Sequence, residues 1–178
     1  MGRFTKLVDT PEGMATFKAK YRIPKNVELQ HCKLREWLVI NESPGAVIIP
    51  MIAFIKGGLE ISMGRVTRDF LINFRLSLTQ CSPNLFRVLG SVDMINRKMG
   101  TNLTCHDVNW VYNCQKGKDI GYYFRCRVPF VRLISCILEL NKGMDEDFLI
   151  VSAEWHDGLH CLTQDGEPGG VFTAHRIT

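Results

Sequence analysis

The chain has 178 residues, of which 46% are hydrophobic and 22% are charged, and its formal net charge is +4 at pH 7. This composition excludes a wholly disordered chain, and a chain of this length needs neither a disulfide nor a metal to fold. The longest apolar run, residues 46–55, is interrupted by Pro50 and is much shorter than the ~20 residues of a membrane helix. Because the amino terminus lacks a signal peptide's hydrophobic core, we expect one intracellular domain, nuclear or cytoplasmic, without membrane contact.

The first part of the chain predicts a helix, a short strand and a turn. Thr10 suits a helix cap, Pro11 suits the first helical position, and Glu12 interacts favourably with the helix dipole. We therefore predict a helix from residue 11 to about residue 20. Residues 27–30 alternate apolar and polar side chains, which predicts a short strand, and residues 41–45 are a cluster of turn-forming residues.

The middle of the chain predicts three helices. Residues 46–56 are ambiguous, because their length favours a helix, their β-branched side chains favour a strand, and Pro50 weakens both; we predict a helix that ends at Gly57 and Gly58. Residues 65–78 show helical spacing of apolar side chains. Ser82 and Pro83 then begin a helix that Gly100 ends. Its apolar stripe consists of Leu85, Val88, Leu89, Val92, Ile95 and Met99.

The last part of the chain predicts one more helix and two strands. Thr104 can cap a helix over residues 107–113, with Trp110 and Val111 on one face. Residues 122–128 and 148–154 are rich in aromatic and β-branched side chains, which predicts two strands of one small sheet. Residues 131–140 between them read as a helix or a buried linker. We therefore predict an α+β fold, with a mostly helical amino-terminal part and a small β-sheet formed late in the chain.

The Cys and His residues form no convincing metal or catalytic site. The seven cysteines lack Cys-x-x-Cys spacing, and we expect reduced, mostly buried thiols. Glycine-rich sequence argues against the helix that would align His156 and His160 next to Cys161. We expect no metal, no cofactor, no small-molecule substrate and no catalysis. The opposing hypothesis is a small metal-dependent enzyme that uses Cys105, His106, His156 or His160.

A basic strand gives the candidate nucleic-acid site. Residues 143–174 contain seven acidic and no Lys or Arg side chains, so the rest of the chain is basic. On residues 122–128, strand alternation places Tyr123, Arg125 and Arg127 on one face. With Arg132, these are the residues that we predict to contact RNA through its phosphates. A half-buried strand with a solvated basic face is the simpler interpretation, which we weight at about three to one given the small contribution of isolated surface charges.

The order of several segments resembles the plant putative gypsy-type transposon domain, a gag-like region of retrotransposons. The matching segments are residues 21–24, Gly45, 54–59, 66–74, 82–84, 122–124, 141–143 and 147–155. Residues 61–65 depart from that family's proline-containing entry to its central helix, and Leu85 or Phe86 stands where the family has tryptophan. The resemblance divides the chain into an amino-terminal extension (1–19), the gag-like domain (20–157) and a flexible tail (158–178).

The resemblance implies a structural protein that self-associates and packages RNA, and no catalytic residue is carried over from it. The expected partners are further copies of the chain and RNA. The alternative is a monomeric nucleic-acid-binding regulatory module, for which we expect affinity that falls steeply with salt.

Overall fold

The computed structural model describes residues 3–33, 47–117, 121–129, 131–134 and 147–152, and its fold is α+β. The helices are α1 (Pro11–Lys20), α2 (Met51–Ile55), α3 (Arg65–Phe74), α4 (Pro83–Met99) and α5 (Cys105–Val111), with 3-10 turns η1 (Thr5–Leu7) and η2 (Leu78–Gln80). The strands are β1 (Glu28–Lys33), β2 (Val47–Pro50), β3 (Tyr112–Lys116), β4 (Tyr122–Cys126) and β5 (Asp147–Ser152). In the described part, no helix is long and apolar enough to cross a membrane.

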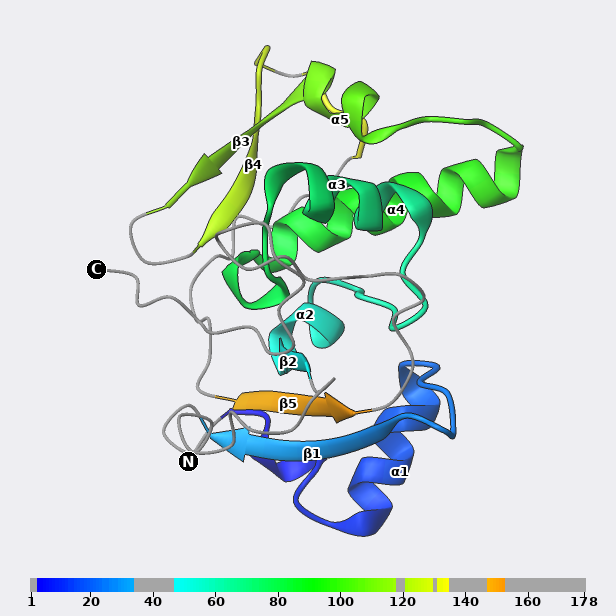
Figure 1. Cartoon of the computed structure of the whole chain (residues 1–178), viewed down its shortest axis with the longest axis vertical. Coiled ribbons are helices and arrows are strands. Elements are labelled where there is room, and N and C mark those ends of the chain that lie inside the picture. The colour runs from blue at the N-terminus through cyan, green and yellow to red at the C-terminus, as the bar shows by residue number, and fades with distance from the viewer. Residues whose placement is uncertain (1–2, 34–46, 118–120, 130, 135–146, 153–178) are drawn as a thin grey trace.

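A three-stranded antiparallel sheet forms one end of the molecule, as Figure 1 shows, with the late strand β5 between the early strands β1 and β2. Val151 pairs with Leu29 on one side and with Val47 on the other. Alternate β5 residues lie in two clusters: Leu149 and Val151 belong to the main core, whereas Phe148 and Ile150 belong to a smaller one. The central strand therefore contributes side chains to two hydrophobic clusters.

The second sheet is the β3–β4 hairpin, at the opposite end of the molecule in Figure 1. This arrangement corrects one expectation, because the two predicted late strands do not share a sheet: β4 pairs with β3, and β5 pairs with β1 and β2. Sequence order favoured the late strands as partners, but β5 instead pairs with the early strands β1 and β2, of which β2 is apolar throughout. Residues 135–140, part of the segment predicted as a helix or linker, lie outside the described residues.

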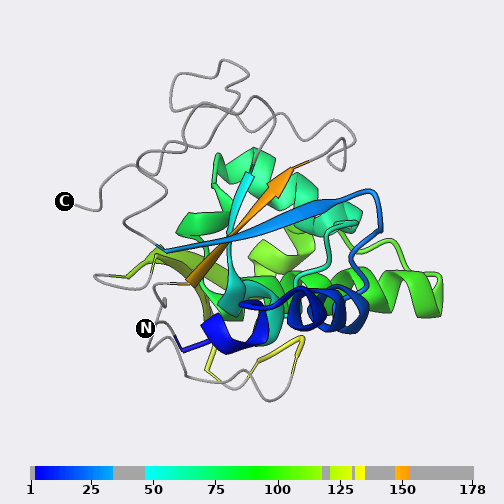
Figure 2. The same ribbon diagram turned by 90° about the horizontal axis from the view of Figure 1, so that it is seen from below.

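Helices α3 and α4 lie between the two sheets, and Figure 2 shows the larger sheet from its outer side. The first four residues of the stripe predicted on α4 are confirmed, since Leu85, Val88, Leu89 and Val92 are fully buried. The last two are not, because Ile95 is only half-buried and Met99, at the helix end beyond the core, is 73% exposed. The helix ends at Gly100, whose φ of +66° is the left-handed conformation that glycine adopts without a steric penalty. Because α4 supplies so many buried side chains, it is the centre of the core.

Helix α1 is capped as predicted, with the Thr10 side chain accepting a hydrogen bond from Gly13 N at 3.0 Å. Its Phe17 packs against Phe54 with ring centroids 5.9 Å apart. The predicted boundary between residues 19 and 20 falls inside this helix, and Val8 and Phe17 share a core with the residues that follow. The predicted tail, residues 158–178, lies outside the described residues.

The helix predicted over residues 46–56 is half wrong. Val47–Pro50 is strand β2, and only Met51–Ile55 is helical. Pro50 is the residue at which the conformation changes: its φ of −61° and ψ of 131° are extended, so that it ends the strand and caps the helix. The helix predicted over residues 65–78 also ends early, because Arg75 adopts a left-handed φ of 51°. Leu78 still reaches the core from η2.

Candidate functional site

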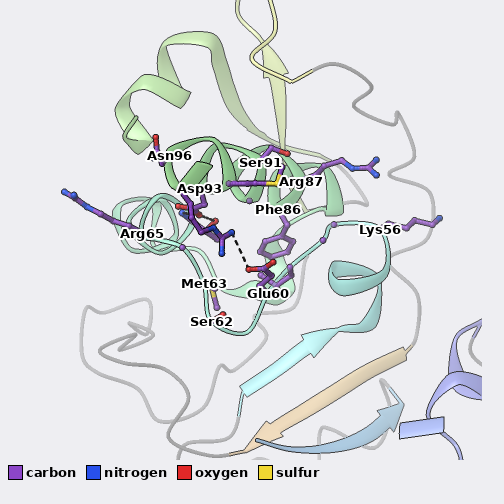
Figure 3. Close-up of a pocket in the computed structure, with 18 of the residues that line it drawn as sticks. Lys56, Glu60, Ser62, Met63, Arg65, Phe86, Arg87, Ser91, Asp93 and Asn96 are labelled. Atoms are coloured by element: carbon purple, nitrogen blue, oxygen red, sulfur yellow. Dashed lines mark hydrogen bonds and ion pairs between the residues drawn. The ribbon is translucent and has the colours of Figure 1, made fainter. Parts of the chain in front are cut away.

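A pocket of about 640 Å³ lies between the loop that follows α2, the start of α3 and one side of α4. Figure 3 shows Glu60 and Asp93 near the middle of the residues that line it, whereas the charged ends of Lys56 and Arg87 point outwards. A pocket of this size is where a small-molecule site would be sought first. The chemistry that the pocket could support therefore depends on the contacts that the carboxylates of Glu60 and Asp93 make.

Both carboxylates of the pocket are engaged in structural contacts. Asp93 accepts hydrogen bonds from Val66 N (2.8 Å), Thr67 N (3.1 Å) and Thr67 Oγ1 (2.7 Å), so it caps the start of α3. Glu60 lies 3.8 Å from Arg97 in an ion pair. Asp93 therefore caps a helix, and Glu60 forms a solvent-exposed ion pair.

The Cys and His candidates are separated in the described part of the chain. Cys105 is buried and its Sγ lies 3.2 Å from Asn73 Nδ2, whereas the neighbouring His106 is exposed on the other side of α5. No group of three His, Cys, Asp or Glu side chains in the described part could hold a metal ion. His156, His160 and Cys161 lie outside the described residues.

Two cysteines, Cys81 and Cys114, are poor nucleophiles. Burial raises the pKa of the Cys81 thiol well above its ordinary value, and the nearby Cys114 raises it further. Burial also raises the pKa of Cys114 to about 11. Both side chains are therefore protonated thiols at neutral pH, and a thiol is a far weaker nucleophile than a thiolate.

The inner face of the β3–β4 hairpin packs on the core. Phe124 is buried, with its ring centroid 5.0 Å from that of Phe70 and 5.4 Å from that of Tyr112. Tyr122 and Cys126 pack against the same core, so the alternation predicted for this strand is confirmed. The opposite face must therefore carry Tyr123 and Arg125.

The outer face of the hairpin brings three of the four predicted site residues into one row along β4. Tyr123 is half-buried and donates a hydrogen bond to Gln115 Oε1 at 3.3 Å, across the hairpin. Arg125 is exposed opposite Asn113. Arg127 is also exposed and extends the row towards α5.

Arg132, the fourth predicted residue, lies near the base of the hairpin. It is exposed, and the next two backbone N–H groups, of Leu133 and Ile134, donate to Tyr112 Oη at 3.0 and 3.2 Å. Burial raises the pKa of Tyr112, while these two hydrogen bonds and the charge of Arg132 act in the opposite direction. The guanidinium is thus close enough to the hairpin to influence a buried residue at its base.

Trp110 is the residue that sequence reasoning missed. It was placed on a helix face with Val111, but its side chain is 81% exposed, on the last turn of α5. Arg127 binds the residues on both sides of it, donating from Nε to Asn109 O at 2.5 Å and from its backbone N to Val111 O at 2.9 Å. Trp110 therefore stands at the end of the basic row. The one signal of its exposure in the sequence was its position next to the helix end, where no other part of the chain needs to cover a side chain.

The described part of this surface carries only positive charge. Residues 109–117, 121–129 and 131–134 contain Lys116, Arg125, Arg127 and Arg132 and no Asp or Glu, while Lys118 and Asp119, between the two strands in the sequence, lie outside the described residues. The nearest acid along α5 is Asp107, which is engaged with Thr104 Oγ1 at 2.7 Å; hydrogen bonds from Thr104 lower its pKa. We call Tyr123, Arg125, Arg127 and the neighbouring Trp110 the hairpin face; Arg132 is a further exposed cation at the base of the hairpin, beside Tyr112 of the inner face.

No protein-family model, curated protein or solved structure matches the chain. The resemblance to the gypsy-type transposon domain therefore stays a prediction. The hairpin face is therefore the candidate site for a function, whereas the acidic side chains of the pocket make structural contacts.

Proposed function

We propose that the protein is a non-catalytic, gag-like interaction module that binds RNA through the hairpin face and self-associates. The observation that carries the RNA part is the row of Arg125 and Arg127 beside Trp110, with Arg132 near the base of the hairpin. The resemblance of segment order supports self-association, as do exposed apolar side chains such as Met99, 73% exposed, and Val128, 56% exposed.

Electrostatics make this face suitable for a phosphate backbone. Arginine side chains form paired hydrogen bonds with phosphate oxygens, and binding releases the counterions that surround the nucleic acid. A carboxylate within the patch would oppose that attraction, and the described residues of the hairpin contain none. The face therefore has the charge and exposure that non-specific phosphate contact requires.

Charge reversal of the three arginines tests RNA binding. In Arg125→Glu/Arg127→Glu/Arg132→Glu, we expect at least about tenfold weaker binding to a labelled 12-nucleotide RNA, followed by fluorescence anisotropy at several salt concentrations. The slope of log K against log salt should become less steep by about 2, since each phosphate contact on a single strand contributes about 0.7. Thermal unfolding of the variant checks that it folds.

The matched control changes the same number of charges on another surface. Arg65, Arg97 and Lys98 are exposed on α3 and α4, and their reversal to Glu should affect binding much less than reversal on the hairpin. An equal loss of affinity in both triple variants would show only a general effect of net charge. Unchanged affinity and salt dependence in the hairpin variant would refute the assignment.

Solution mass separates the gag-like proposal from the alternative of a monomeric nucleic-acid-binding regulator. Light scattering behind a sizing column, over a range of protein concentrations, should show growth from monomer to larger species if the chain assembles. A monomer at every concentration, combined with salt-dependent RNA binding, would support the regulator instead.

A further inference from the structure

We infer that Trp110 stacks on an unpaired base, so that the hairpin face selects single-stranded RNA over duplex RNA. This inference rests on the proposed function and names the form of RNA that the face binds. It begins from the exposure of the indole: the side chain is 81% exposed, the most exposed large apolar side chain in the described part of the chain. A surface tryptophan has no packing role and presents both a flat apolar face and one N–H donor to a ligand.

The backbone around Trp110 is held firmly, although its side chain is free to meet a ligand. Arg127 bonds to the carbonyls of Asn109 and Val111, one residue to either side. Val108, two residues earlier, is fully buried and anchors α5 on the core. A fixed backbone on both sides of the indole favours stacking, because a base binds more tightly when the ring loses little conformational entropy on contact.

The row on β4 continues from this platform. Same-face residues along a strand are about 6.6 Å apart, so Tyr123, Arg125 and Arg127 span about 13 Å. A row of that length can contact a few consecutive nucleotides, near the lower end of the roughly 4–16 nucleotides that single-strand-binding folds contact. Tyr123, half-buried at the far end of the row, offers a second aromatic ring. The order of side chains along the face is therefore Tyr123, Arg125, Arg127 and Trp110, which places two charges between two aromatic rings. Surfaces that bind single strands combine aromatic and basic side chains in this manner.

Duplex RNA does not fit this arrangement. Its bases are already stacked on each other, and its major groove is too deep and narrow for side chains to read, so an exposed indole gains little from it. In a single strand, by contrast, stacking one base on an aromatic side chain changes affinity by about fivefold to a hundredfold. The arginines attract both forms, whereas Trp110 favours only one.

The test compares Trp110→Ala and Trp110→Phe with the unaltered full chain, using a labelled 12-nucleotide oligouridine and a labelled 12-base-pair RNA duplex. We expect Trp110→Ala to weaken binding to the single strand at least about fivefold, with duplex affinity and the salt slope unchanged. Trp110→Phe should retain most of the affinity. Met94→Ala, which removes an apolar side chain that is 41% exposed on α4, is the control and should bind like the unaltered chain.

A second readout observes the ring directly. The chain has three tryptophans, so Trp37→Phe/Trp155→Phe leaves Trp110 as the only tryptophan, whose emission is recorded with excitation beyond the tyrosine absorption band. Saturation with oligouridine should quench its emission strongly, and saturation with the duplex should leave it nearly unchanged. Equal quenching by both forms would overturn the inference, as would quenching by neither.

The outcomes separate failure of this inference from failure of the proposed function. If the arginine triple variant loses affinity but Trp110→Ala does not, the face binds RNA by charge alone and the stacking role is wrong. If neither variant loses affinity, both proposals are wrong. If Trp110→Ala lowers the solution mass and leaves RNA affinity intact, Trp110 belongs to an interface between protein chains, which also overturns the stacking role.

Discussion

Asp147 joins the amino terminus of the chain to the larger sheet. Its carboxylate accepts hydrogen bonds from Phe4 N at 2.7 Å and Thr5 Oγ1 at 2.9 Å, and lies 3.2 Å from His31 Nε2. The residue is only 1% exposed. Burial by itself would raise the pKa of this carboxyl, but the three hydrogen bonds outweigh burial and lower it. The charged form is therefore the form that stabilises the fold.

Replacing this carboxylate by an amide should destabilise the protein. We expect Asp147→Asn to lower the free energy of unfolding by about 1–3 kcal/mol at neutral pH, because charge-assisted hydrogen bonds are lost and an amide cannot accept from all three donors. Urea denaturation measures the difference. Asp9→Asn, at an exposed position, should change stability by less than about 0.5 kcal/mol.

The same site sets a pH dependence. A carboxyl whose pKa is lower in the folded chain stabilises it fully above the unfolded pKa, and this contribution disappears as pH falls through the folded pKa. The ordinary value is 3.8. The stability gap between the unaltered chain and Asp147→Asn should therefore narrow as pH falls below that value. A gap that stayed constant to lower pH would show that charge is not the cause.

At the scale of elements, the hairpin is positioned by a close backbone approach at Gly121. Its φ is +69°, and a Cβ on this residue would lie 2.3 Å from Gln80 O. The contact continues where Ser82 N donates to Tyr122 O at 2.8 Å. The start of β4 is thus held against the segment before α4, and this fixes the direction in which the hairpin face points.

Two glycines with nearly the same dihedral angle separate conformational strain from lack of space. Gly100 has a φ of +66°, and a Cβ there would have nothing within 4 Å. We expect Gly100→Ala to cost about 1 kcal/mol from strain alone, and Gly121→Ala to cost at least about 2 kcal/mol because the backbone must also move. Chemical denaturation of both variants measures this. Equal costs would show that the approach to Gln80 relaxes easily.

At the scale of the whole molecule, the amino-terminal helix belongs to the core. The Phe17 ring is 4.5 Å from that of Tyr21 and 5.9 Å from that of Phe54, measured between centroids. Because Phe54 lies on α2, next to the larger sheet, the first helix closes one side of the core. The described residues from Val8 to Val151 therefore contribute to one main hydrophobic core.

Removing the Phe17 ring tests whether the amino-terminal helix and the rest of the fold depend on the same core. We expect Phe17→Ala to lower the free energy of unfolding by about 3–5 kcal/mol, since it leaves a cavity in a packed aromatic cluster. Circular dichroism during urea denaturation should show a single transition at lower urea concentration. Phe17→Leu should cost clearly less, because it keeps most of the volume. A small effect of Phe17→Ala would indicate that residues 1–19 are dispensable, as the predicted amino-terminal extension implies.

Local signals in the sequence determined the start of α1, the end of α4 and the faces of single elements. Thr10 with Pro11, the α4 stripe ended by Gly100, and the alternation in β4 each depend on residues a few positions apart, and each is seen in the structure. Their physical causes are capping, left-handed φ and side-chain period, which operate within one or two turns. The inner face of the candidate site was predictable for the same reason.

Only the tertiary structure decided which strands pair and which side chains remain exposed. The partners of β5 are the two early strands β1 and β2, and the Asp147 carboxylate meets Phe4 across 143 positions of sequence. Val108 in the last turn of α5 is buried, whereas Trp110 two residues on is exposed, and no periodicity in seven helical residues reveals that difference. Such contacts arise from the simultaneous packing of distant segments, so no local pattern encodes them.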